Sequence, residues 1–177
     1  RRVQTEVTEL KTTQGEKGPA VDFGNWQAFS ILVVDDEAGM RSFLERALKA
    51  RCGTVAAAGS VEEASEMMAR LHFDLIVLDI SLPGKTGTEW LHELRRSGYS
   101  GDVILITAFA DMETAINALR GGASDFILKP FRVDQILNSI KLCFERAGLA
   151  RENFVLRREL AEFCAEVDGL MPQEKIP

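Results

Sequence analysis

One stretch decides the fold: it reads Leu-Ile-Val-Leu-Asp at residues 75–79. A continuous apolar run of this length is typical of a strand that is buried on both faces, as in a parallel sheet covered by helices. Pro83, Gly84 and Gly87 follow the run and predict a turn before the next element. The run therefore places a carboxylate, Asp79, at the point where a buried strand ends.

Three other predicted strands end in the same way. They occupy residues 31–34, 103–106 and 125–128, and they lead into Asp35-Asp36, Thr107 and Lys129. A weaker fifth strand is expected at 54–58, and apolar residues recur with helical spacing between the strands. Five strands that alternate with five helices predict an α/β fold with a parallel sheet and helices on both faces. In such sheets the polar chemistry gathers at the carboxyl ends of the strands.

The three acids at this edge predict a metal site. Carboxylates held close together repel one another, so a cation must join them or at least one pKa must rise. Oxygen ligands with room for water and phosphate oxygens suit Mg²⁺. We expect Asp35, Asp36 and Asp79 to bind Mg²⁺, with a backbone oxygen from the loop after Asp79 as a further ligand.

The same residues carry the parts needed for phosphoryl transfer. A carboxylate beside Mg²⁺ can attack phosphorus and form an aspartyl phosphate, which makes Asp79 the candidate acceptor. The transition state spreads negative charge over the phosphoryl oxygens. Lys129 supplies an ammonium and Thr107 a hydroxyl to stabilise that charge. Any one of these residues alone would more often be a cap or a loop residue, whereas four strand ends that agree are much more specific.

Composition and charge argue against several other classes of protein. The formal net charge of -6 argues against non-specific nucleic-acid binding by this chain. No apolar run is long enough to cross a bilayer, and Arg1-Arg2 is not followed by the apolar segment of a signal peptide. Cys52, Cys143 and Cys164 are expected to be reduced thiols that pack as small apolar side chains. We expect the protein to be cytoplasmic.

These motifs resemble the response-regulator receiver domain of two-component signalling over residues 30 to about 148. The similar stretches are Ile-Leu-Val-Val-Asp-Asp-Glu at 31–37, Leu-Ile-Val-Leu-Asp-Ile-Ser-Leu-Pro at 75–83 with Gly87, Thr107-Ala108, and Asp-Phe-Ile-Leu-Lys-Pro-Phe at 125–131. The resemblance implies a flavodoxin-like (βα)5 doubly wound sheet with strand order 2-1-3-4-5. It also implies a regulatory module that promotes its own phosphorylation and dephosphorylation and is not a conventional enzyme.

The family implies a role for each matching residue. Asp79 would be the phosphorylation site, Asp36 would bind Mg²⁺ directly, Asp35 would bind it largely through water, and the Ser81 backbone carbonyl would complete the protein ligands. Thr107 and Lys129 would hold the phosphoryl oxygens. The Lys129-Pro130 peptide bond would be cis.

The resemblance also implies a switch. Thr107 would move to bond the phosphoryl group, and Phe126, the aromatic switch residue, would fill the space that opens. This would shift the face made by the fourth and fifth helices and the fifth strand, and we expect that face to mediate phosphorylation-linked homodimerisation. Ser81 and Phe109 lie where the family places side chains near the attacking water, so Phe109 is expected to shield the phosphate.

The flanking segments divide the chain into a polar leader at 1–29, the receiver domain at 30–148 and a helical linker at 149–177. After Pro130, two interpretations stay open. A 4-3-4-3-4 spacing of apolar residues is typical of a coiled-coil seam and comprises Ile136, Ile140, Cys143, Ala147, Ala150 and Phe154. The alternative is a last helix packed on the sheet, followed by a second short helix after Gly148.

The tail from Leu156 resembles the linker of nitrogen-regulation-type activators, in which a receiver precedes an ATPase domain and a DNA-binding domain. Neither output domain can be recognised in this sequence, and the chain does not begin with Met, so we expect a regulatory fragment. The expected partners are a sensor histidine kinase, a second copy of the chain and that output domain, with no membrane and no direct nucleic-acid contact.

Two rival interpretations remain. A haloacid-dehalogenase-type phosphatase also uses an Asp, a Thr, a Lys and Mg²⁺, but its nucleophile lies on the first strand and not on the third, where Asp79 lies. A pure interaction module predicts damaged acid positions, and all are intact here. His72 and His92 are interpreted as surface or packing residues on helices, away from the site.

Overall fold

Ten elements alternate along the chain, as the sequence predicts. The computed structural model describes residues 26–108 and 112–170. In chain order the elements are β1 (Trp26–Val34), α1 (Ala38–Lys49), β2 (Cys52–Ala58), α2 (Val61–Met68), β3 (Leu75–Asp79), α3 (Gly87–Arg96), β4 (Asp102–Thr107), α4 (Met112–Arg120), β5 (Asp125–Leu128) and α5 (Val133–Leu170).

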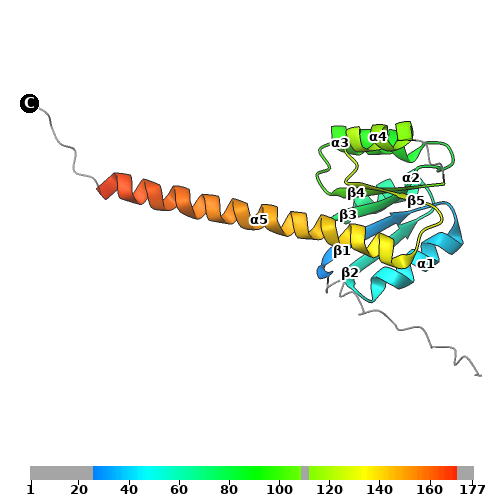
Figure 1. The fold of residues 1–177 in the computed structure, drawn as a ribbon, viewed down its shortest axis with the longest axis horizontal. Coiled ribbons are helices and arrows are strands. Elements are labelled where there is room, and N and C mark those ends of the chain that lie inside the picture. The colour runs from blue at the N-terminus through cyan, green and yellow to red at the C-terminus, as the bar shows by residue number, and fades with distance from the viewer. Residues whose placement is uncertain (1–25, 109–111, 171–177) are drawn as a thin grey trace, which may run out of the picture.

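The five strands form one sheet in the order β2-β1-β3-β4-β5, and every neighbouring pair is parallel (Figure 1). The expected flavodoxin-like order is thereby confirmed. All strands point the same way, so their carboxyl ends meet at one edge of the sheet. The chain reverses direction across the sheet between β1 and β3, which is where ligands bind in open sheets of this kind.

Helices cover both faces of the sheet, which explains the continuous apolar strands. Along β1, Ile31 and Val33 pack against α1 and α5, whereas Leu32 and Val34 pack in the cluster that includes α2, α3 and α4. Successive side chains of a strand point to opposite faces, so both sets are buried. Each fully buried aliphatic side chain contributes about 1.5–3 kcal/mol relative to exposure. The core therefore holds the strand ends in place.

β1 begins earlier than expected. Residues 26–29, which we expected to belong to the polar leader, are part of the strand. The Trp26 backbone N–H donates to the carbonyl of Arg51 at 2.9 Å, and the indole is buried. It packs edge-on against Phe144 of α5, with ring centroids 5.5 Å apart, while Phe29 stacks on the same ring at 4.0 Å. Trp26 lies between Asn25 and Gln27, so the sequence shows no apolar run here from which the early start of the strand could be predicted.

α5 is a single helix of 38 residues that runs through Gly148 and extends well past the sheet (Figure 1). Of the two open interpretations, the one with a second short helix after Gly148 is therefore wrong on that point. One glycine costs a helix only about 1 kcal/mol, and the flanking residues favour helix. The other interpretation, a coiled-coil seam from Ile136 to Phe154, is wrong in its first half. Ile136, Ile140 and Cys143 are buried against the sheet and cannot face a second chain.

The described cysteines are free thiols buried in the core. Cys52 and Cys143 both pack in the cluster beneath α1 and α5. Burial raises the pKa of Cys52 to about 11 and that of Cys143 to about 12, so neither forms a thiolate readily. Both behave as small apolar side chains, as expected; the Cys164 side chain lies outside the described residues. Among the described helices, none has the length and apolar character needed to span a membrane.

Candidate functional site

The predicted site residues meet at the carboxyl edge of the sheet. Asp35 directly follows β1, Asp79 ends β3, Thr107 ends β4 and Lys129 directly follows β5. β1, β3, β4 and β5 are consecutive in the sheet, so residues separated by almost a hundred positions become neighbours. The expectation that these strand ends converge is thus fulfilled by the topology.

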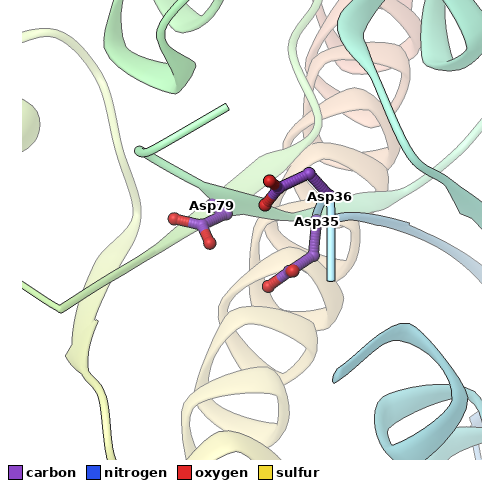
Figure 2. Close-up of side chains that lie close together, drawn as sticks. All are labelled: Asp35, Asp36 and Asp79. Carbon is purple, nitrogen blue, oxygen red and sulfur yellow. The ribbon is translucent and has the colours of Figure 1, made fainter. Parts of the chain in front are cut away.

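Asp35, Asp36 and Asp79 form an acidic cluster whose ligand oxygens lie within 4.8 Å of one another (Figure 2). Asp35 and Asp79 are buried, whereas Asp36 is exposed. Three carboxylates with one side open to solvent fit a hard divalent cation that keeps some of its water. The donor set therefore fits Mg²⁺, with Asp35, Asp36 and Asp79 as the residues that would hold it.

Lys129 ties two of these acids together. Its Nζ donates to Asp79 Oδ2 at 2.5 Å and to Asp35 Oδ2 at 2.9 Å. All three side chains are largely shielded from solvent, so the charges interact more strongly than on the surface. The ammonium thus lies beside the carboxylate that would carry a phosphoryl group. The Lys129-Pro130 peptide bond is cis, as the resemblance implied.

Burial and the neighbouring charges together raise two pKa values in this cluster. Burial raises the pKa of Asp35, and the hydrogen bond from Lys129 offsets only part of that effect. Burial alone would lower the pKa of Lys129, but its hydrogen bonds and charge interactions with Asp79 and Asp35 outweigh burial and raise it. Lys129 is therefore a fixed cation at neutral pH, in a site with more negative than positive charge.

Local backbone hydrogen bonds orient the carboxylates of Asp35 and Asp79. The backbone N–H of Glu37 donates to Asp35 Oδ1 at 2.8 Å, and that of Ser81 donates to Asp79 Oδ1 at 2.9 Å. Arg41 Nη1 donates to the carbonyls of Asp35 and Asp36 at 2.7 and 2.9 Å and so fixes the loop after β1. Arg41 carries no distinct signal in the sequence, because it is one of several arginines on predicted helices.

The loop after Asp79 is held at both ends. The Gly87 backbone N–H donates to the Ile80 carbonyl at 2.9 Å, and a Cβ at position 87 would lie 2.3 Å from the Asp79 carbonyl oxygen. Only glycine fits this close approach. Thr86 and Glu89 then form a complete capping box at the start of α3. The Thr-x-x-Glu spacing at residues 86–89 is a helix-start signal that the sequence already contains.

The remaining predicted residues fall into two groups. Thr107 is buried at the end of β4, and Phe126 is half-buried beside β4, in the cluster beneath α2, α3 and α4. Ser81 is exposed next to the acids. Phe109, expected to shield the phosphate, lies outside the described residues.

Neither histidine belongs to the site. His72 and His92 are both exposed, His72 in the loop between α2 and β3 and not on a helix as expected, and His92 on α3.

Replacing Asp35 with asparagine is expected to stabilise the Mg²⁺-free protein at neutral pH. Since the pKa of Asp35 is raised in the folded state, ionisation of this carboxyl disfavours folding. The advantage of Asp35→Asn should therefore grow as the pH rises above the ordinary value of 3.8 and vanish below it. Thermal unfolding followed by circular dichroism measures both curves. Added Mg²⁺ should stabilise wild type more than the variant; a less stable variant at neutral pH without metal would contradict the prediction.

A flavodoxin-like domain with acids, a threonine and a lysine at its carboxyl edge is the arrangement of a signal-receiver domain. The family model for the response regulator receiver domain matches residues 31–141, and the chain belongs to this family. The AtoC regulatory protein of Escherichia coli (strain K12) is 34% identical over 122 residues, which cover 69% of this chain and 26% of AtoC. DctD, a C4-dicarboxylate transport transcriptional regulatory protein of Pseudomonas aeruginosa, is 35% identical over 132 residues, which cover 75% of this chain and 29% of DctD.

Solved structures agree with this family. The beryllofluoride-activated NtrC4 receiver domain dimer is 34% identical, with a TM-score of 0.62, and the match covers 66% of this chain and 97% of that one. A CheY-like receiver domain protein from Methanospirillum hungatei JF-1 is 27% identical, with a TM-score of 0.63, over 67% of this chain and 94% of that one. Together with AtoC and DctD, the NtrC4 match confirms the expected resemblance to nitrogen-regulation-type regulators. The chain spans less than a third of the length of AtoC and DctD.

The family match favours a regulatory module over the phosphatase interpretation. A receiver domain of regulatory proteins is a signalling module, and the acid at the third-strand end, Asp79, occupies the position that distinguishes it from the phosphatase alternative. Asp35, Asp36 and Asp79 are intact and gathered, which a module that is never phosphorylated does not require.

Proposed function

We propose that the chain receives a signal as a phosphoryl group on Asp79, donated by a phosphohistidine of a sensor histidine kinase. The observation that carries the proposal is the contact of Lys129 Nζ with both Asp79 and Asp35 inside the acidic cluster. The same ammonium that now pairs with the Asp79 carboxylate is placed to pair with a phosphoryl oxygen once Asp79 is phosphorylated. The family match supports this role for the chain as a whole.

In the transfer step, an oxygen of the Asp79 carboxylate attacks phosphorus. The new O–P bond forms as the P–N bond to the donor imidazole breaks, and the imidazole leaves with the bonding electron pair and takes up a proton. The Ser81 N–H holds Asp79 Oδ1, so the carboxylate keeps a fixed orientation. In this proposal Oδ2, the atom now bonded to Lys129, is the attacking oxygen.

Each remaining residue of the site has a role that follows from its position. Mg²⁺, when bound, supplies positive charge to the phosphoryl oxygens. Asp36 would hold it directly, Asp35 largely through water and the Ser81 carbonyl from the loop. Lys129 pairs with a phosphoryl oxygen, and the hydroxyl of Thr107 donates to another.

The switch would begin at Thr107. Its movement toward the phosphoryl group frees space that the half-buried ring of Phe126 can enter, and the face made by α4, β5 and α5 shifts with it. The NtrC4 receiver, a dimer when activated by beryllofluoride, supports a link between phosphorylation and self-association. Phosphorylation should therefore strengthen self-association, and an association constant that does not change would contradict this part of the proposal.

The parent protein would be a transcription regulator of the nitrogen-regulation type. AtoC and DctD are named as regulatory proteins, and this chain covers only 26% and 29% of them. We propose that the chain controls an output region made of an ATPase domain and a DNA-binding domain, in the cytoplasm. The chain itself would contact the kinase, a second copy and this output region, and neither membrane nor nucleic acid.

The test is incubation with Mg²⁺ and acetyl phosphate, followed by intact-mass measurement. Wild type should gain one phosphoryl group, and Asp79→Asn should gain none. Asp134→Asn, which changes an exposed carboxylate at the start of α5, is the matched control and should gain one group. Wild type without a gain, or an Asp79→Asn variant that gains as much as wild type, would overturn the proposal. Sustained hydrolysis of small phosphoesters would support the phosphatase alternative.

A further inference from the structure

A small cavity lies at the edge of the sheet opposite to the acidic cluster, beside the point where α5 leaves the sheet (Figure 1). Its volume is about 200 Å³, and its walls come from the strand starts and from α5. Asp74 directly precedes β3 and Asp102 begins β4, whereas Asp79 lies at the far end of β3. At about 3.3 Å per strand residue, the length of β3 separates the cavity from Asp79 by about 16 Å. The cavity is therefore separate from the phosphoryl site.

A glycine on the inner face of α5 leaves this space open. Ile136, Ile140 and Phe144 follow one another at four-residue spacing and pack on the sheet. Gly148 is the next residue on the same face of the helix. A Cβ at this position would meet no atom within 4 Å outside its own stretch of helix. The inner stripe of α5 thus lacks a side chain at the place where it passes the strand starts.

The cavity combines an apolar wall with charged groups of both signs. The rings of Phe29 and Phe144 stack with centroids 4.0 Å apart, and they line the cavity together with Asp74, Asp102 and Arg151. Arg151 lies seven residues after Phe144 and so shares its face of the helix. Among the residues whose side chains the structure describes, none forms a hydrogen bond or an ion pair with the Arg151 guanidinium. One cation and two anions therefore line the same cavity without pairing with each other.

Both carboxylates are fixed in place and still have room for another donor. Asp74 Oδ2 accepts from the backbone N–H and the hydroxyl of Ser30 at 2.8 and 2.7 Å, and its Oδ1 lies 3.9 Å from His72 Nε2. Asp102 Oδ1 accepts from the hydroxyl of Ser124 at 2.5 Å. An ionised carboxylate has about four acceptor sites on its two oxygens. Each acid can therefore bind a further N–H group.

We propose that this cavity binds a free α-amino acid with an apolar side chain. The ammonium of the ligand would donate to Asp102 and Asp74, and its carboxylate would pair with the Arg151 guanidinium. Its side chain would cover the stacked rings. A zwitterion pairs with both signs of charge at once, whereas a simple amine would face Arg151 and a simple acid would face two carboxylates.

The size of the cavity agrees with a ligand of this kind. At roughly 30 Å³ per water molecule, its volume corresponds to about seven waters. Drug-sized ligands occupy pockets of about 300–1,000 Å³, so only a compact molecule fits here. A single amino acid is such a molecule.

This site goes beyond the proposed function, because it uses none of the residues that would hold the metal or the phosphoryl group. A ligand here would contact the sheet edge and α5 together, and would hold the helix to the domain where the helix leaves it. Binding would stabilise the folded domain by mass action. The amino acid would thereby act on the same helix that leads toward the proposed output region.

The test is an NMR titration of the unphosphorylated chain with L-leucine and, separately, with L-phenylalanine at millimolar concentration. With at least one of the two, amide shifts at residues 100–102 and 147–151 should change and saturate. Leucinamide lacks the carboxylate and isocaproate lacks the ammonium, so each should bind about 10-fold or more weakly than L-leucine. An absence of saturable shifts with both amino acids would overturn the proposal, as would leucinamide that binds as tightly as L-leucine.

Two pairs of variants locate the site. Arg151→Gln should weaken binding about 10-fold or more. Arg158→Gln, which changes an exposed arginine paired with Glu162 on the same helix, should bind like wild type. Gly148→Leu should fill the cavity and abolish binding without loss of stability, because leucine favours helix more than glycine does. Ala150→Leu, at an exposed position of α5 that does not line the cavity, is its control. Equal weakening by the two arginine variants, or unchanged binding by Gly148→Leu, would overturn the proposal.

A last comparison separates this site from the phosphoryl chemistry. Asp79→Asn should bind the amino acid as wild type does, and Gly148→Leu should still gain one phosphoryl group from acetyl phosphate. An Asp79→Asn variant that no longer binds the amino acid would contradict a site that is independent of phosphorylation. The mass test at Asp79 and the titration can therefore fail separately.

Discussion

Replacing Lys129 with methionine is expected to slow phosphoryl uptake at Asp79 by a factor of about 100 to 1000, the usual cost of one lost donor at a charge-stabilising site. Methionine keeps the length of the side chain but removes the ammonium. In wild type, Lys129 Nζ donates hydrogen bonds to Asp79 Oδ2 at 2.5 Å and to Asp35 Oδ2 at 2.9 Å. The rate of mass gain with acetyl phosphate at saturating Mg²⁺ measures the effect.

The variant also tests whether the protein stays stable when the two buried carboxylates lose the ammonium that pairs with them. Without Lys129, Asp35 and Asp79 lie buried next to each other with no cation except the metal, so the variant should depend on Mg²⁺ for stability more than wild type does. Its circular dichroism spectrum should match wild type when Mg²⁺ is present.

Lys49→Met is the control for the lysine variant. Lys49 is an exposed lysine on α1 that pairs only at the surface with Glu45, so the rate should stay at the wild-type value. A Lys129→Met variant that is phosphorylated as fast as wild type would show that the ammonium has no part in the transfer. A slow Lys49→Met variant would show that loss of any lysine affects the assay.

Replacing Phe144 with alanine is expected to lower the free energy of unfolding by about 3–5 kcal/mol, the cost typical of a buried phenylalanine. The ring is 5% exposed and contacts both Trp26 and Phe29, which come from the first residues of β1. The cavity would open at the place where α5 leaves the sheet. Urea unfolding at constant m-value measures the loss.

Phe154→Ala on the same helix is the control for Phe144→Ala. Phe154 is 69% exposed and lies ten residues further along, so its loss should change stability by no more than about 0.5 kcal/mol. If both variants lost the same stability, α5 would owe its position to helix propensity and not to the aromatic cluster. If Phe144→Ala cost nothing, the early start of β1 at Trp26 would have no structural role.

Local features of the sequence predicted most of the fold. A short run of apolar residues bounded by turn signals is typical of a strand buried on both faces, so residues 31–34 and 75–78 could be predicted as parallel strands from local sequence. The strand order came from the family resemblance, because the order of strands depends on pairings between residues far apart in the chain. The register of those pairings is likewise absent from any local pattern.

The candidate site was also predictable as a set of residues, but not as a set of contacts. Each of Asp35, Asp79, Thr107 and Lys129 ends a predicted strand, which places all four at one edge. Lys129 contacts both Asp79 and Asp35 because of the path that the chain takes after β5. No pattern of apolar residues in the sequence describes that path. The role of Arg41 could not be predicted either. Its partners are backbone carbonyls, which every residue has, so no pattern of side chains points to them.

The sequence by itself determined that the chain makes a parallel α/β domain with acids, a hydroxyl and an ammonium at its functional edge. Tertiary structure decided which stripe of α5 is core and which is exposed. Both stripes are apolar and both repeat at about 3.5 residues, so periodicity cannot tell them apart. The sheet covers the side of α5 that carries Ile136 and Ile140, because the aromatic residues of β1 contact Phe144 and hold the helix in that rotation. Leu149 and Leu156 are exposed because the sheet ends before the helix does.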